Sequence, residues 1–295
     1  MSRMFVSICA AICAGASAAA AQDRAELVQA VIESAPDEAW RTLDPDNTLY
    51  MDLEAGRLII ELAPELAPRH VARLKTYARE HFYDGLTFHR VIDEVIAQGG
   101  DPLGNGTGGS DKPDLPAEFM LYAPPENKIL VLGRDQQADQ IGFIRSLPAA
   151  SELEMTRVLR ANKLLPTWGL HCPGVMSMAR ANDPNSANSQ FFLVLGDARR
   201  SLDLRYSVWG RIVHGFEHTD SIARGQPPEN PTIIQSVRLA SDLPPEQRVV
   251  VQVMRTDSDA FRQILDITEA VVDGRVIDIC DIDIPSRIVS GEGAA

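Results

Sequence analysis

The sequence predicts a mainly β domain of antiparallel strands with two helices beside it, followed by a small α+β tail. Three observations lead to this fold class. Residues 49–62 alternate between apolar and polar side chains and then continue as an apolar run after Gly56, which is typical of a β-hairpin. A helical apolar face then begins at Pro68, a position that suits proline because its missing N–H is not needed there. Later apolar runs predict strands over 191–195, 206–213 and 233–239, a short helix over 216–222, and a tail made of a strand over 249–253, a helix over 258–271 and a strand over 277–284.

The first 21 residues have the features of a secretory signal peptide. Arg3 precedes a short apolar run, and small residues then lead to Ala21. A charged start, an apolar centre and an A-x-A cleavage site are the three parts of such a signal. We expect cleavage near Ala21-Gln22 and a periplasmic or secreted protein. The run is too short to span a bilayer as a helix, so no membrane span is expected in the mature chain.

Composition and motifs argue against several function classes. The 295-residue chain has 28 Lys+Arg against 41 Asp+Glu, whereas a nucleic-acid partner needs a basic surface. The glycine-rich segment 104–109 is not followed by the Gly-Lys-Ser/Thr of a phosphate-binding loop. Among the six histidines only His214 and His218 have a spacing that would suit a metal on a helix, and no third ligand is evident. We therefore expect no nucleic-acid partner, no metal and no cofactor.

Two cysteines, Cys172 and Cys280, would remain after removal of the signal peptide. An even pair in an exported protein indicates a disulfide. The alternative is a pair of buried free thiols.

Three segments carry the chemistry. Arg90 lies within a β-branched run that ends in Gln98-Gly99-Gly100-Asp101, and a strand has little reason to carry a guanidinium unless its charge has a target. An edge-strand arginine that reaches water is the alternative for that stretch alone. Ser177–Ala181 and Asn188–Phe192 follow in order. Together the FHR, QGGD, SMARA and SQFF motifs resemble the cyclophilin family of peptidyl-prolyl cis-trans isomerases, over residues 48–242.

The resemblance implies a closed, eight-stranded antiparallel β-barrel with two flanking helices. It also divides the chain into a signal peptide (1–21), an N-terminal helical lead-in (22–47), the cyclophilin-like domain (48–242) and a C-terminal extension (243–295). Residues 120–171 exceed the usual family connection and form an insertion. The apolar run at 129–132 predicts a strand there, and Ser151 with Glu154 forms a capping box ahead of a helix. We expect the insertion to fold as a subdomain, because loops of this length are otherwise uncommon.

The resemblance also implies the site. Arg90 would donate a hydrogen bond to the proline nitrogen in the twisted transition state, Gln98 would position Arg90, and Phe192 would form the floor of an apolar proline pocket. Such chemistry needs no nucleophile, metal or general base, because a preorganised donor stabilises the transition state directly. The implied substrate-binding residues are Val95, Ile96, Ala179, Arg180, Ala181, Gln190, Leu202 and Tyr206.

Some positions depart from the family pattern. Val95 stands where most cyclophilins have phenylalanine, and Ser201 stands where cyclosporin-sensitive members have tryptophan. Asp93-Glu94 replaces the usual Pro-Gly, and Leu204 replaces a turn glycine. Three functions therefore remain open: an isomerase for exported or envelope proteins, a binding module or chaperone with weak catalysis, and a protein whose insertion and tail dock a specific envelope partner, with isomerase activity incidental. For the first two, the expected partner is a proline-containing polypeptide, and a monomer is favoured.

Overall fold

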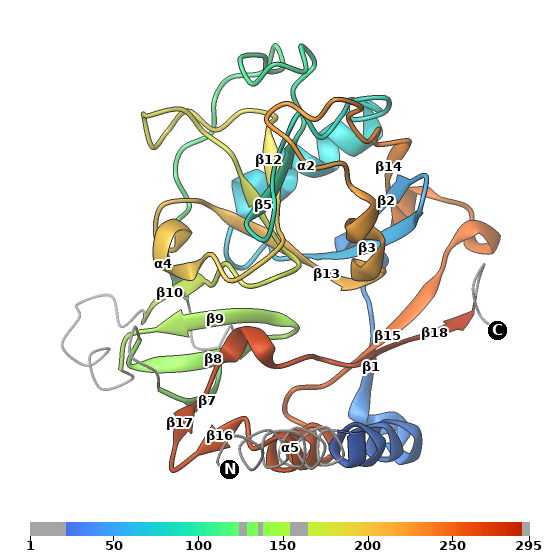
Figure 1. Cartoon of the computed structure of the whole chain (residues 1–295), viewed down its shortest axis with the longest axis vertical. Coiled ribbons are helices and arrows are strands. Elements are labelled where there is room, and N and C mark those ends of the chain that lie inside the picture. The colour runs from blue at the N-terminus through green and yellow to red at the C-terminus, as the bar shows by residue number, and fades with distance from the viewer. Residues whose placement is uncertain (1–21, 124–128, 135–137, 154–164, 291–295) are drawn as a thin grey trace, which may run out of the picture.

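The protein is described by a computed structural model over residues 22–123, 129–134, 138–153 and 165–290. Eight antiparallel strands form its main sheet: β2 (Thr48–Leu53), β3 (Gly56–Leu62), β4 (Arg90–Ile92), β5 (Ile96–Gly99), β11 (Val175–Met178), β12 (Phe191–Val194), β13 (Val208–His214) and β14 (Ser236–Leu239). Their order is β14-β2-β3-β13-β11-β12-β5-β4, and Figure 1 shows this sheet curling through the upper half of the molecule. The predicted hairpin over 49–62 is confirmed as β2–β3.

The expectation of a closed barrel is wrong. Within the described residues the two end strands, β4 and β14, do not pair with each other. Only isolated bridges lie in this gap, joining Thr87 to Ile233 and Val91 to Gly225. The segment that fills the gap carries prolines at positions 227, 228 and 231, which have no N–H to donate to a ladder. The sheet is therefore a curled half-barrel.

The concave face of this sheet encloses an apolar core that is covered by the predicted helix, α2 (Pro68–Arg79). Glu118 completes the start of that helix, because its carboxylate accepts hydrogen bonds from the backbone N–H groups of Arg69 (3.1 Å) and His70 (3.2 Å). Side chains alternate across a strand, so Phe191 enters this core while Phe192 packs on the outer face. The second predicted helix is a 3-10 helix, Phe216–Ser221.

The insertion contributes a second, five-stranded sheet. Its strands are β6 (Leu121–Ala123), β7 (Leu130–Gly133), β8 (Gln140–Ile144), β9 (Leu147–Ser151) and β10 (Leu165–Gly169), in the order β6-β10-β9-β8-β7. Its apolar side chains share one core with Phe192 of the main sheet and Phe261 of the tail, so the insertion is not a separately packed subdomain. The predicted capping box is wrong at Ser151, which ends β9 and donates to Gln140 Oε1 at 3.1 Å. The helix expected beyond it falls mainly on 154–164, outside the described residues.

The N- and C-terminal extensions meet on the same side of the molecule. They share a three-stranded sheet, β1 (Trp40–Thr42), β15 (Val250–Met254) and β18 (Ser286–Ser290), and Figure 1 shows blue β1 and red β18 on either side of β15. A helix over 22–34 packs near α5 (Asp259–Thr268), where Ser258 Oγ accepts from the N–H of Phe261 at 3.1 Å. Both helices were predicted. Among the described residues no helix is long and apolar enough to cross a membrane.

The predicted strand over 277–284 is wrong. Asp278 accepts the N–H of Cys280 and so starts a 3-10 turn over Ile279–Asp281, and the edge strand begins only at Ser286. The remaining short elements are α4 (Arg199–Leu202), β16 (Val271–Val272), β17 (Arg275–Val276) and the 3-10 turns Asp37–Ala39, Pro45–Asn47, Ala240–Asp242 and Pro245–Gln247.

Candidate functional site

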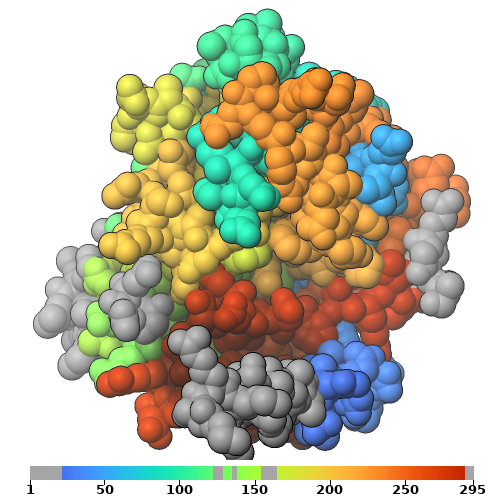
Figure 2. Space-filling view, in the orientation of Figure 1, coloured from blue at the N-terminus to red at the C-terminus, as the bar shows by residue number. Residues whose placement is uncertain are grey.

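Three neighbouring strands place Arg90, Gln98 and Phe192 in one row. The register pairs Arg90 with Gln98 across β4 and β5, and Gln98 with Phe192 across β5 and β12. Residues opposite each other in antiparallel strands share a face of the sheet, so all three side chains lie on its outer face. With strands about 4.8 Å apart, the backbones of Arg90 and Phe192 are separated by about 10 Å. The space-filling view shows the surface of the β4–β5 hairpin, in blue-green, between the yellow and orange segments (Figure 2).

A chain of amide hydrogen bonds orients the guanidinium. Arg90 Nη1 donates to Gln98 Oε1 and Arg90 Nε donates to Gln226 Oε1, both at 3.2 Å. Gln98 Nε2 donates to Gln190 Oε1 at 2.9 Å, and Gln190 Nε2 donates to the carbonyl of Gly108 at 2.8 Å. No described carboxylate forms an ion pair with Arg90. The guanidinium is held only by neutral amide oxygens among the described residues, so its positive charge has no paired negative charge. Sequence reasoning missed Gln226, which lies 136 residues from Arg90.

The QGGD turn and the glycine-rich segment form a loop beside this row. Gly100 has a φ of +83°, and a Cβ there would lie 2.5 Å from the carbonyl oxygen of Ser189. Asp101 accepts the N–H groups of Leu103 at 2.8 Å and Asn105 at 3.1 Å. Burial by itself raises the pKa of Asp101, but these backbone donors outweigh it and hold the pKa below its ordinary value. The carboxylate thus fixes the shape of the loop.

Apolar side chains surround Phe192, which is only 3% exposed. Tyr206 meets its ring edge-on, with the ring centroids 5.2 Å apart. Ile96 is buried in the same cluster, and Leu202 and Val95 are half-buried against it. The structure therefore gathers the predicted pocket residues around Phe192, with Val95 as an aliphatic rather than an aromatic neighbour.

The other predicted substrate-binding residues line an adjacent groove of about 340 Å³. Gln98, Gln190, Ala179, Arg180 and Ala181 share this groove with the glycine-rich loop. The N–H of Ala179 already donates to the carbonyl of Gln190, and that of Ala181 donates to Ser186 Oγ, both at 2.9 Å. These two N–H groups are therefore occupied and are not free for a peptide strand.

The side chain of Arg180 has a role that the sequence did not indicate. Its guanidinium lies 4.8 Å from the ring centroid of Tyr206 and 5.5 Å from that of Phe119. Its Nε donates to the carbonyl of Arg205 at 3.0 Å. Arg180 thus packs over the rim of the apolar cluster through cation–π contact.

Two departures from the family pattern retain a glycine-like backbone. Glu94 has a φ of +55° and Leu204 a φ of +60°. Non-glycine residues in this region cost roughly 1–3 kcal/mol and persist only where the surrounding structure imposes them. Both lie on turns beside the site, after β4 and after α4.

Sequence reasoning also missed a buried group behind Phe192. The ring of His171 stacks on Phe192 with centroids 6.0 Å apart and an interplanar angle of 23°. His171 also contacts Ser177 and Asp203 through hydrogen bonds. No local pattern could have shown this group, because Asp203 lies 32 residues from His171.

The histidine pair considered for a metal is not on one helix. His214 lies at the end of β13 and His218 in a 3-10 helix. Within the part of the chain that the structure describes, only Asp197, Asp278 and Cys280 gather three potential ligand atoms within 4.8 Å. Cys280 is in a disulfide, and Arg199 donates to both carboxylates, so these groups already have partners.

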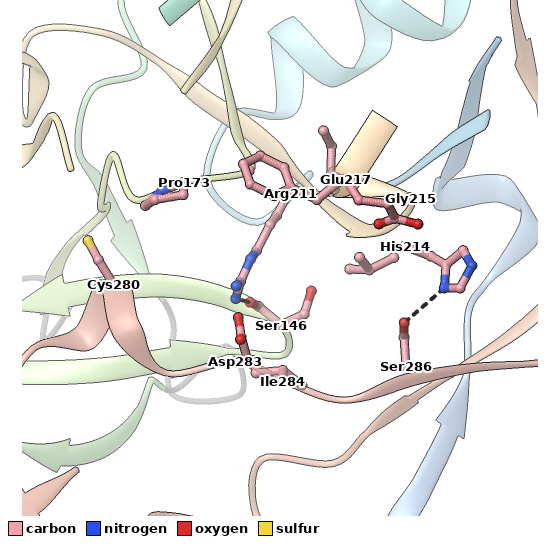
Figure 3. A pocket seen from close by; sticks show the side chains of 14 residues that line it. Ser146, Pro173, Arg211, His214, Gly215, Glu217, Cys280, Asp283, Ile284 and Ser286 are labelled. Carbon is pink, nitrogen blue, oxygen red and sulfur yellow. Dashed lines mark hydrogen bonds between the residues drawn. The ribbon is translucent and has the colours of Figure 1, made fainter. Parts of the chain in front are cut away.

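The disulfide predicted between Cys172 and Cys280 is present, joining positions 108 residues apart. A cavity of about 220 Å³ lies beside it, between β13 and the tail (Figure 3). Arg211 reaches into this cavity and its Nη1 donates to the carbonyl of Ser146 at 2.7 Å. Burial lowers the pKa of Arg211, while nearby carboxylates oppose the shift. The cavity belongs to the junction between the main sheet and the tail.

Known proteins match this chain in sequence and in fold. The family model "Cyclophilin type peptidyl-prolyl cis-trans isomerase/CLD" matches residues 48–241. A probable peptidyl-prolyl cis-trans isomerase of Brucella suis is 35% identical over 201 residues, which cover 64% of this chain and 78% of that protein. Peptidyl-prolyl cis-trans isomerase B of Bacillus subtilis is 57% identical over 180 residues, covering 61% and 92%. The crystal structure of cyclophilin AquaCyp293 from Hirschia baltica matches with a TM-score of 0.77 and 36% identity, covering 90% of this chain and 98% of that one. The chain belongs to the cyclophilin family of peptidyl-prolyl cis-trans isomerases.

Proposed function

We propose that this cyclophilin is exported and that Arg90 is the residue that accelerates rotation about X-Pro bonds. The observation that carries the proposal is the amide-held guanidinium in register with Phe192. Gln98 accepts a hydrogen bond from Nη1 of Arg90, and Gln226 accepts one from Nε. No described residue accepts a hydrogen bond from Nη2 of Arg90. That donor is left for a substrate.

The chemistry of the X-Pro bond explains why one fixed donor is enough. Resonance gives the bond a rotational barrier of about 18–20 kcal/mol. As the amide twists, resonance is lost and the nitrogen lone pair becomes a hydrogen-bond acceptor. A donor aimed at this nitrogen is therefore stronger in the transition state than in the ground state, which is the condition for raising kcat. A planar guanidinium that stays charged at all working pH values suits this role.

The apolar cluster around Phe192 would hold the proline ring while the preceding carbonyl turns. Phe192 provides its floor, Ile96, Val95 and Leu202 its aliphatic sides, and Tyr206 its rim. The adjacent groove would receive the residues that precede the proline, with Gln98 and Gln190 as polar contacts. Flexible or unfolded proline-containing chains are the substrates that fit this open arrangement.

Export is supported by two features of the chain. Residues 1–21 have the pattern of a signal peptide, and Cys172 and Cys280 form a disulfide, which is typical of oxidising compartments. We propose residues 48–242 as the catalytic unit and 22–47 and 243–295 as extensions, which share the sheet of β1, β15 and β18. The intact mass of the protein recovered from the periplasm or the medium tests export: a chain that still begins at Met1 contradicts it.

The catalytic role of Arg90 is tested by isomerisation kinetics on a proline-containing peptide. Removing one preorganised donor typically lowers kcat by about 10²–10³-fold, so Arg90→Ala should lose at least tenfold while KM changes little. Arg90→Lys should recover only part of the rate, because it keeps the charge but not the planar fork. Arg79→Ala is the matched control, since that arginine only pairs with Asp242 on the surface of α2.

The alternative function, a binding module or chaperone with weak catalysis, is favoured by the aliphatic Val95 beside Phe192. The same experiment separates the two. A wild-type rate no higher than that of folded Arg90→Ala, together with retained peptide binding, would replace the catalytic proposal with the binding one.

A further inference from the structure

Behind the proline-binding face, the buried side chains of His171 and Ser177 and the half-buried side chain of Asp203 form a linear hydrogen-bonded group. His171 Nδ1 lies 2.8 Å from Asp203 Oδ1, and His171 Nε2 lies 2.8 Å from Ser177 Oγ. His171 and Ser177 are 0% exposed. The order Ser-His-Asp is that of a hydrolase triad, but a nucleophile must reach its substrate. Ser177 is enclosed within β11, opposite Phe192 and Val208, so its hydroxyl cannot reach and attack a substrate.

The partners determine which nitrogen of His171 carries the proton. A carboxylate only accepts, so Nδ1 must donate to Asp203. In the neutral ring, Nε2 is then the acceptor for the Ser177 hydroxyl. Asp203 Oδ1 also accepts the backbone N–H of His171 at 2.9 Å, which adds a second bond to the same oxygen.

This group ties together the parts of the chain that carry the pocket. Ser177 lies opposite Phe192 in the register of β11 and β12. Asp203 directly follows Leu202 and ends α4, and the carbonyl of His171 accepts the N–H of Ala198 just before that helix at 3.0 Å. The His171 ring itself backs Phe192 and meets Tyr206 edge-on, with centroids 6.5 Å apart. The His171 side chain thus contacts Phe192 at the floor of the pocket and Tyr206 at its rim. Through Asp203 it also holds the end of α4, which carries Leu202 at the side of the pocket.

We propose that His171 is a positioning residue for the proline pocket, acting through Asp203 and Ser177 on Phe192, Leu202 and Tyr206. The inference rests on the proposed function, because it assumes that these three side chains grip the proline ring. The grip acts in the ground state and in the transition state alike, so its loss raises KM more than it lowers kcat. This signature is the opposite of that expected for Arg90→Ala.

The test compares kcat and KM, obtained from line-shape analysis of cis and trans peptide resonances. Small displacements of positioning groups cost up to about 10²-fold, so we expect His171→Phe and Asp203→Ala to raise KM about tenfold with kcat within about threefold of wild type. Asp203→Asn keeps an acceptor oxygen for both bonds and should restore KM to within about twofold. His214→Phe, a half-buried histidine on β13 that contacts Ser286, is the matched control and should behave as wild type.

A second measurement needs no variant. The ring nitrogen shifts of His171 in the wild-type protein should report the Nδ1–H tautomer, and an Nε2–H tautomer would overturn the inference. Folded His171→Phe and Asp203→Ala proteins with wild-type KM would overturn it as well. If the wild-type protein itself does not accelerate isomerisation, the proposed function fails instead, so the two failures are distinguishable.

Discussion

Glu61 on β3 holds the extension, the main sheet and the insertion together, and its replacement by glutamine is the most informative stability test. The side chain is 5% exposed. It accepts hydrogen bonds from Arg41 Nη1 at 2.6 Å and Arg41 Nη2 at 2.7 Å, and from the Ser146 hydroxyl, and it lies 3.3 Å from Arg145 Nη1. Arg41 belongs to β1, and Arg145 and Ser146 to the turn between β8 and β9. One carboxylate therefore joins three sheets.

The expected loss follows from leaving the Arg41 guanidinium without its counter-charge, since Arg145 keeps its pair with Glu65 at 2.7 Å. Removing one partner of a buried pair costs about 3–5 kcal/mol, so Glu61→Gln should lower the free energy of unfolding by that amount near neutral pH. For a protein of this size the melting temperature should fall by roughly 6–20 °C. Asp242→Asn is the matched control: its pair with Arg79 is exposed, and its loss should cost about 0–1 kcal/mol.

The difference between wild type and Glu61→Gln should depend on pH. Burial by itself raises the pKa of Glu61, but hydrogen bonds from Arg41 and the charge of Arg145 outweigh it and place the pKa below its ordinary value of 4.5. A carboxyl group with a lowered folded pKa contributes stability above its unfolded pKa and loses it as the pH falls through the folded value. Urea unfolding should thus show the full difference near pH 7 and a difference that shrinks as the pH falls below the ordinary value of 4.5 and through the lowered folded pKa. Equal stability at neutral pH, or a difference that does not shrink in acid, would refute this reasoning.

Three further outcomes are expected. Val95 and Ser201 replace aromatic contacts worth on the order of 1–3 kcal/mol each, so cyclosporin should inhibit about 10²-fold more weakly than it inhibits sensitive cyclophilins. Val95→Phe with Ser201→Trp should restore inhibition in a titration, and nanomolar inhibition of the wild type would contradict the idea. Replacing Cys172 and Cys280 by serine should cost about 4–5 kcal/mol of unfolding free energy by loop entropy, and two alkylatable thiols in the native protein would argue against the bridge. Asp101→Ala should raise KM severalfold, because the loop N–H groups lose their acceptor. The melting temperature of the protein should stay unchanged, which serves as the control.

Local signals in the sequence were sufficient for the elements that depend on short-range pattern. The alternation over 49–62 predicted the hairpin, and Pro68 with its apolar face predicted α2, because hydrophobic periodicity and proline geometry act within a few residues. The roles of Arg90, Gln98 and Phe192 were predicted through the family motifs, and the strand register places the three residues in one row. The period of two in β12 then explains why Phe192 faces outward while Phe191 is buried in the core.

Local signals were misleading where a side chain competed with the pattern. Residues 277–284 are apolar enough for a strand, but Asp278 caps its own backbone and starts a 3-10 turn. Ser151 has capping-box spacing, yet pairing with β8 and β10 makes it the end of a strand. Aspartate and serine side chains can cap a local turn or helix, and they can also lie in a strand. Pairing with neighbouring strands decides which of the two forms.

Only the tertiary structure decided the contacts that hold the site. His171 and Asp203 are 32 residues apart, Arg41 and Glu61 are 20 apart, and Arg90 and Gln226 are 136 apart. Such partners meet because the sheet register and the packing of α4 and the 222–235 segment bring them together, and no local propensity encodes that approach. The open edge between β4 and β14 has the same origin, since closure depends on which distant segment fills the gap. The sequence by itself determined the family and the motifs that contain the proposed site residues; the fold decided which distant side chains contact them.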